Sequence, residues 1–225
     1  MFSAPVRRVA CLSWWRQNPV ALFAVSHHPP PRGAAVSQFE FFMTFYSLLL
    51  GLAVAELLLG FANLLRNRAR PRLGLLTPLL GVFVFLQLMA TFIDAWGRLQ
   101  HVALTMDGLA LPTAIGVLLF FLSVIVVPRH PAEWTDLDEY FRANRRWALG
   151  LAIAANLLVL GYELPNLPAE HLPTYVAINV LGFSLMGGAM LLRRRLGIAA
   201  CLGALILFFL YIYSDFSMTI FAPSA

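Results

Sequence analysis

The feature that most constrains this chain is a series of long apolar runs separated by short clusters of arginine. A helix needs ~20 apolar residues to cross the hydrocarbon core of a bilayer, and several runs reach that length. Every backbone N–H and C=O inside lipid must be paired, so such runs form either helices or the strands of a closed barrel. The runs show no strand-like alternation of apolar and polar residues, which excludes a barrel. We therefore predict an all-α integral membrane protein, a bundle of six transmembrane helices. The predicted spans are about 41–65, 73–96, 108–127, 147–164, 173–192 and 196–221.

Composition supports this class and excludes others. The chain is 60% hydrophobic and 12% charged, whereas soluble domains carry about 25% charged residues. Its sixteen arginines and absent lysines give a net charge of +5, but they lie between apolar runs rather than on a basic face, so no nucleic-acid partner is expected. The absence of lysine also excludes Schiff-base and P-loop chemistry. A GC-rich genome explains the arginine usage, and the pattern is typical of small bacterial multi-pass proteins.

The arginine clusters predict the topology. The loops after the first, third and fifth spans carry four, four and three arginines, whereas the loops after the second and fourth carry only Arg98. Short cytoplasmic loops are enriched in Lys and Arg. We therefore expect the odd-numbered loops in the cytoplasm, both termini extracytoplasmic, and a multi-pass protein of the bacterial inner membrane.

The first 35 residues conflict with that topology, because Arg7, Arg8, Arg16 and Arg32 favour a cytoplasmic N-terminus. We interpret residues 1–35 as a disordered tract, or as one that is not translated because initiation occurs at Val36. Residues 36–225 are then the six-span transmembrane domain.

The longest loop precedes the fourth span and predicts an amphipathic surface helix that continues into the membrane. Thr135 followed by Asp138 resembles a capping box. Asp138 and Arg142 have the i,i+4 spacing of a helical ion pair.

Glu56 is the one carboxylate within the first span. It lies ten residues before Arg66, or ~15 Å along the helix, which predicts a position near the midplane. A charge there costs at least ~2.5 kcal/mol, so Glu56 should face the bundle. It shares a helix face with Asn63, and we expect a hydrogen bond to Gln87 of the second span, with Asn156 of the fourth span also in the polar core.

A second group of acidic residues lies toward the predicted outer surface. We interpret Asp94, Glu163 and Asp215 as solvated interface residues, with Asp94 able to pair with Arg98. In a transporter, Asp94 and Asp215 would form an acidic outer mouth.

Three functions remain open. The first is a small transporter or channel, in which Glu56 handles protons or ions and Gln87, Asn156 and Asn63 line the path. The second is a non-catalytic subunit of a membrane complex, in which Glu56 only fixes helix packing. The third is a lipid-acting membrane enzyme, but no hydrolase, zinc-protease or nucleotide motif supports enzymatic activity. No metal site or cofactor is predicted, and the expected partners are the bilayer, further copies of the chain or other membrane subunits.

Overall fold

Apart from one isolated β-bridge, the regular structure of the described residues is helical, as the apolar runs predict. The computed structural model describes residues 38–66, 72, 74–101, 105–130, 133–169 and 171–213, which belong to one compact unit. Two short 3-10 turns, η1 (Leu99–His101) and η3 (Leu164–Asn166), follow the second and fourth long helices. The six long helices are α2 (Gln38–Arg66), α3 (Leu76–Arg98), α4 (Met106–Val126), α5 (Leu137–Glu163), α6 (Leu172–Leu191) and α7 (Arg195–Tyr211).

Four of these helices, α2, α3, α4 and α6, are long and apolar enough to cross a membrane. This composition indicates a helical membrane protein. Helix α5 has 27 residues but begins with a charged segment, and α7 is apolar but has only 17 residues. The count of six spans and the side on which the termini lie stay predictions.

The helix boundaries lie within a few residues of the predicted spans for α2, α3, α4 and α6, and at the start of α7. Helix α5 begins ten residues before the predicted fourth span, 147–164, because the predicted amphipathic segment and the span form one continuous helix. Residues 214–221, predicted to extend the sixth span, and the tract 1–35 lie outside the described residues.

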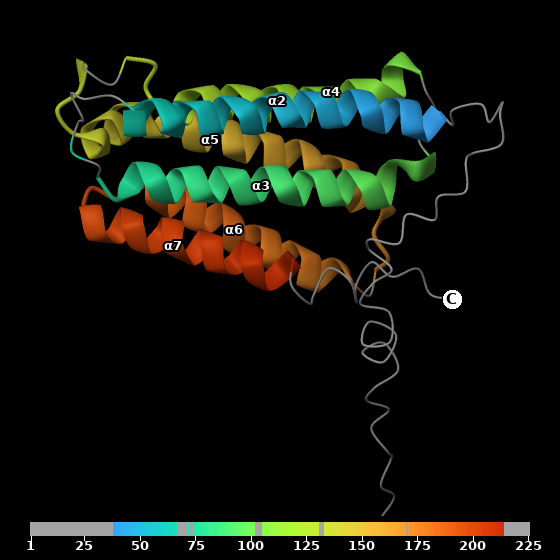
Figure 1. Cartoon of the computed structure of the whole chain (residues 1–225). Helices are drawn as coiled ribbons and strands as arrows, with labels where there is room; N and C mark the ends of the chain where they lie inside the picture. The colour runs from blue at the N-terminus through green and yellow to red at the C-terminus, as the bar shows by residue number, and fades with distance from the viewer. Residues whose placement is uncertain are drawn as a thin grey trace, which may run out of the picture. The chain divides into compact units, whose positions relative to one another are not determined.

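Successive helices run in opposite directions (Figure 1). Helices α2, α4 and α6 end where α3, α5 and α7 begin, and we call this the arginine end, after Arg129, Arg193 and Arg194. We call the opposite end the acidic end, after Asp94 and Glu163. These two names refer only to the bundle and not to a side of the membrane.

Helices α2 and α4 pack in parallel because glycine lets them approach closely. A Cβ on Gly116 would lie 2.5 Å from Cδ2 of Leu49, and one on Gly60 would lie 2.9 Å from Cβ of Val127. Small residues permit such close helix contacts in membranes. Helix α3 lies between the α2–α4 pair and the α6–α7 pair (Figure 1). Its buried Phe83 and Leu88 belong to the common hydrophobic core.

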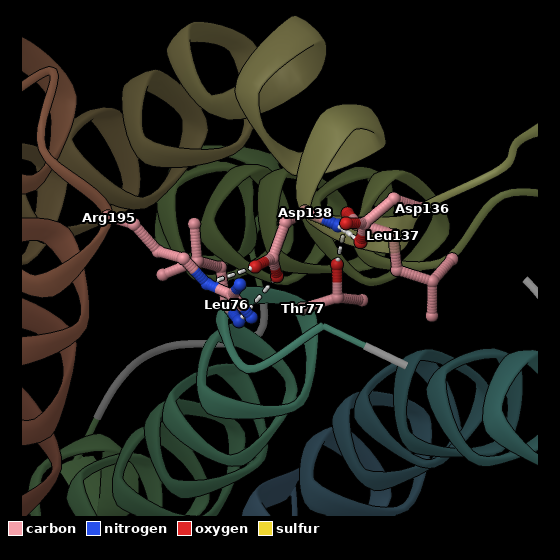
Figure 2. Close-up of polar contacts among 6 residues, drawn as sticks. All are labelled: Leu76, Thr77, Asp136, Leu137, Asp138 and Arg195. Carbon is pink, nitrogen blue, oxygen red and sulfur yellow. Dashed lines mark hydrogen bonds and ion pairs between the residues drawn. The ribbon is translucent and has the colours of Figure 1, made fainter. Parts of the chain in front are cut away.

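At the arginine end, one buried carboxylate joins the starts of three helices, in what we call the Asp138 junction (Leu76, Thr77, Leu137, Asp138 and Arg195; Figure 2). Oδ1 of Asp138 accepts the backbone N–H of Leu76 at 2.9 Å, which satisfies one unpaired donor of the first turn of α3. Its Oδ2 forms an ion pair with Nε of Arg195 at 2.6 Å. The hydroxyl of Thr77 donates to the carbonyl of Leu137 at 2.9 Å.

The junction corrects two sequence predictions for this loop. The N-cap of α5 is Asp136, whose Oδ1 accepts the N–H of Asp138, so Thr135 and Asp138 do not form a capping box. The ion-pair partner of Asp138 is Arg195 rather than Arg142. Both predictions used spacing within one helix, whereas the side chain of Asp138 is 5% exposed and points toward α3 and α7.

Candidate functional site

A cavity of about 140 Å³ lies among α3, α5, α6 and α7, between the middle of the bundle and the acidic end. Helix–helix clefts are a common place for ligand sites. The polar side chains that line it are Gln87, Thr91, Asp94, Asn156, Glu163, His171, Tyr175, Asn179 and Tyr213.

Two parallel helices supply the same pair of side-chain types to this cavity. Gln87 precedes Asp94 by seven residues on α3, and Asn156 precedes Glu163 by seven residues on α5. Seven residues are nearly two helical turns, so each pair shares one face and its members lie roughly 10 Å apart along the axis. The cavity therefore has a carboxylate level near the acidic end and an amide level deeper in the bundle.

At the carboxylate level, each acid accepts a tyrosine hydroxyl. The hydroxyl of Tyr213 donates to Oδ2 of Asp94 at 2.6 Å, and that of Tyr175 makes a short hydrogen bond to Oε2 of Glu163. Glu163 is only 5% exposed. A second cavity of about 60 Å³, among α2, α3, α4 and α5, is also lined by Asp94 and Glu163, so these carboxylates lie between two cavities.

At the amide level, two asparagines each donate one N–H to the backbone, and one buried amide oxygen has no partner in the described part of the chain. Asn156 donates its Nδ2 to the carbonyl of Ala152 at 2.7 Å, and Asn179 donates to Tyr175 at 2.9 Å. Gln87 is 3% exposed, and its Oε1 is buried without a hydrogen-bond partner in the described part of the chain. Such an orphan acceptor is uncommon, because leaving it unpaired costs about 1–3 kcal/mol.

The remaining lining is mostly apolar. Met186 of α6 and Phe208 and Phe209 of α7 form part of it. No arginine is among the described lining residues, and His171 is the one basic side chain there. The site thus combines an apolar wall with two carboxylates and a buried amide oxygen that has no partner in the described part of the chain.

Of the sequence-predicted polar core, Gln87 and Asn156 line this cavity, but neither Glu56 nor Asn63 does. Asp94, predicted for the acidic mouth, lines it as well. Asn63 is exposed on α2. Glu56 is one-third exposed, and its Oε1 forms an ion pair with Nη2 of Arg129 at 3.6 Å. No hydrogen bond joins Glu56 to Gln87 among the described residues, because Glu56 lies beside the end of α4 while Gln87 lines the cavity.

Relative to α4, Glu56 lies toward the arginine end, and its position near the membrane midplane stays a prediction. Leu49 of α2 contacts Gly116, the middle residue of α4, and Glu56 lies seven residues further along α2, or roughly 10 Å toward the arginine end. The prediction counted back from Arg66, but α2 reaches several residues past the end of α4, since Gly60 already contacts Val127.

The acidic mouth is only partly within the described residues. Asp94 has Tyr213 as a partner, whereas Asp215 and the side chain of Arg98 lie outside the described part. Glu163, expected to be solvated, is buried instead. Its seven-residue spacing from Asn156 was the signal that could have identified it, and Tyr175 and Asn179 likewise share a face of α6.

Among the described residues, no group of three or more His, Cys, Asp or Glu side chains is arranged to hold a metal ion. Compared with protein-family models, curated proteins and solved structures, the chain matches none. The cavity is therefore the feature from which a function can be inferred.

Proposed function

We propose that this protein is a small membrane transporter whose solute enters the cavity among α3, α5, α6 and α7. In this proposal all six long helices cross the membrane, with the arginine end in the cytoplasm of a bacterial cell and the cavity toward the outer side. The carboxylates that handle the solute are Asp94 and Glu163. Glu56 has a structural role beside Arg129.

The observation that carries the proposal is the set of polar side chains around a cavity inside an otherwise apolar bundle. Polar and ionisable groups within membrane helices are costly, and they commonly mark substrate pathways. A bundle that needed only to pack would be more stable with an apolar residue at Gln87, whose Oε1 has no partner in the described structure.

The arrangement of the two ends also supports transport. Gln87 lies eleven residues from the start of α3, so roughly 16 Å of helix separates the amide level from the arginine end. The Asp138 junction ties the starts of α3, α5 and α7 together there. A cavity on one side of a closed contact is the arrangement that alternating access requires.

Flux measurements on the full chain in proteoliposomes test the proposal. Concentration jumps of alkali-cation, ammonium and butylammonium chlorides and of sodium butyrate would be applied while current and internal pH are recorded. We expect protein-dependent movement of at least one solute, reduced at least tenfold in Glu163→Gln and unchanged in the matched variant Glu56→Gln.

If none of these solutes moves, transport is refuted and an accessory-subunit role is favoured. Flux lost in Glu56→Gln but kept in Glu163→Gln would refute the assignment of the pathway to this cavity and restore the carboxylate of α2 as the coupling group.

A further inference from the structure

The chemistry of the cavity indicates the kind of solute that fits it. Its polar side chains include two carboxylates, which are acceptors when ionised. Asp94 and Glu163 supply carboxylate oxygens, and the hydroxyls of Tyr213 and Tyr175 already donate to them. An ionised carboxylate accepts hydrogen bonds at about four sites and donates none, so both groups present acceptors only.

The deeper level adds further acceptors. Asn156 and Asn179 each donate one amide N–H to the backbone of their own helices, and both side chains line the cavity. Gln87 provides independent evidence that a hydrogen-bond donor from a ligand is missing. It is 97% buried, lines the cavity, and has an Oε1 without a partner in the described structure. A ligand that satisfies the Gln87 oxygen must itself donate a hydrogen bond.

The charges around the cavity also favour a hydrogen-bond donor that is a cation. Two carboxylates face the cavity, and the basic side chain present among its described lining residues is His171. An anion there would meet like charges in a poorly solvated site, whereas a cation would be attracted. An ammonium group has three donors and no acceptor, which complements this lining.

The volume of the cavity and its apolar wall limit the size and polarity of the rest of the solute. The cavity volume of about 140 Å³ is close to that of an engineered protein cavity, about 150 Å³, that holds benzene. Met186, Phe208 and Phe209 offer an apolar surface beside the acceptors. This surface suits a short hydrocarbon tail, and a bare metal ion would leave it empty.

We propose that the solute is a small protonated amine with a short apolar tail, an inference that rests on the proposed transport function. Its ammonium group binds between the two levels, with the carboxylates of Asp94 and Glu163 on one side and the amide of Gln87 on the other. Its tail lies against Phe208 and Phe209.

A charge series of similar shape tests this proposal directly. Binding of butylammonium, butan-1-ol and butyrate to the purified full chain in detergent micelles would be measured by titration calorimetry, with empty micelles as the blank. We expect butylammonium to bind at least tenfold more tightly than either of the other two. Gln87→Leu and Glu163→Gln should each weaken butylammonium binding at least threefold, and Glu56→Gln should not.

Equal binding of the three probes, or full affinity for butylammonium in Glu163→Gln, would overturn the proposal. If Glu163→Gln does not fold, as judged by far-UV circular dichroism, then Asp94→Asn and Gln87→Leu decide, and full affinity in both would overturn it. Amine binding without flux in proteoliposomes refutes transport alone, whereas flux of other solutes without selective amine binding refutes the amine assignment alone.

Discussion

The Asp138 junction predicts an asymmetry between two substitutions at the same ion pair. The side chain of Asp138 is 5% exposed, whereas that of Arg195 is 50% exposed. Replacing Arg195 by Gln leaves a buried carboxylate without its cation. Replacing Asp138 by Asn leaves an arginine that can turn toward water, and the amide oxygen of Asn can still accept the N–H of Leu76. Arg195→Gln should therefore cost more stability than Asp138→Asn.

The structure allows a rough magnitude for each change. Removing one partner of a fully buried ion pair costs about 3–5 kcal/mol, and the exposure of Arg195 reduces this to about 2–3 kcal/mol for Arg195→Gln. For Asp138→Asn, the charge-assisted bond to Leu76 becomes a neutral one and the ion pair is lost, which costs about 1–2 kcal/mol. The double variant should be more stable than Arg195→Gln alone, because it no longer buries an unpaired charge.

The free energy of unfolding would be measured by titrating sodium dodecyl sulfate into the detergent-solubilised protein and following far-UV circular dichroism. Asp107→Asn is the matched control, because Asp107 is exposed in the first turn of α4, and the change should stay within about 0.5 kcal/mol. If Asp138→Asn is the more damaging single change, or if the two changes are additive, the reasoning about the buried carboxylate is wrong.

Three further predictions concern other parts of the bundle. Gly74→Ala should destabilise the protein by about 1–3 kcal/mol, because the new Cβ would lie 1.9 Å from Oδ1 of Asp138, whereas Gly51→Ala, with nothing within 4 Å of its Cβ, should not; unfolding titrations compare the two. Burial raises the pKa of the Tyr140 phenol, which lies before the predicted fourth span, so its contribution to stability is complete below the ordinary tyrosine pKa of about 10 and is lost as the pH rises above it. Tyr140→Phe should therefore lose less stability than the wild type between pH 9 and about pH 11, and equal losses would contradict this. Gln87→Leu should stabilise the bundle by roughly 1 kcal/mol, because it removes a buried unpaired oxygen, and an unchanged or lower unfolding midpoint would show that this oxygen has a partner.

Much of the helical framework could be predicted from local properties of the chain. The length and hydropathy of the apolar runs decide where a helix can cross a bilayer, and backbone pairing in lipid leaves little choice of structure. The face shared by Gln87 and Asp94 follows from helical periodicity alone, and both side chains line the cavity. The same arithmetic relates Asn156 to Glu163, and it was available in the sequence although Glu163 was expected to be solvated.

The choice of partners could not be predicted in this way. Glu56 is beside Arg129 because glycine contacts place α2 along α4, and Asp138 pairs with Arg195 because α7 begins beside α3 and α5. Neither contact lies within one helix, so no spacing in the sequence reports it.

The sequence by itself therefore determined the class of this protein, the position of its helices and which residues share a helix face, because these depend on solvent transfer and on the geometry of one helix. The tertiary structure alone decided which faces meet, which carboxylates are buried and where a cavity remains. The physical reason is that apolar surfaces of different helices are nearly interchangeable in lipid, so the neighbours are selected by close packing and by a few buried polar contacts.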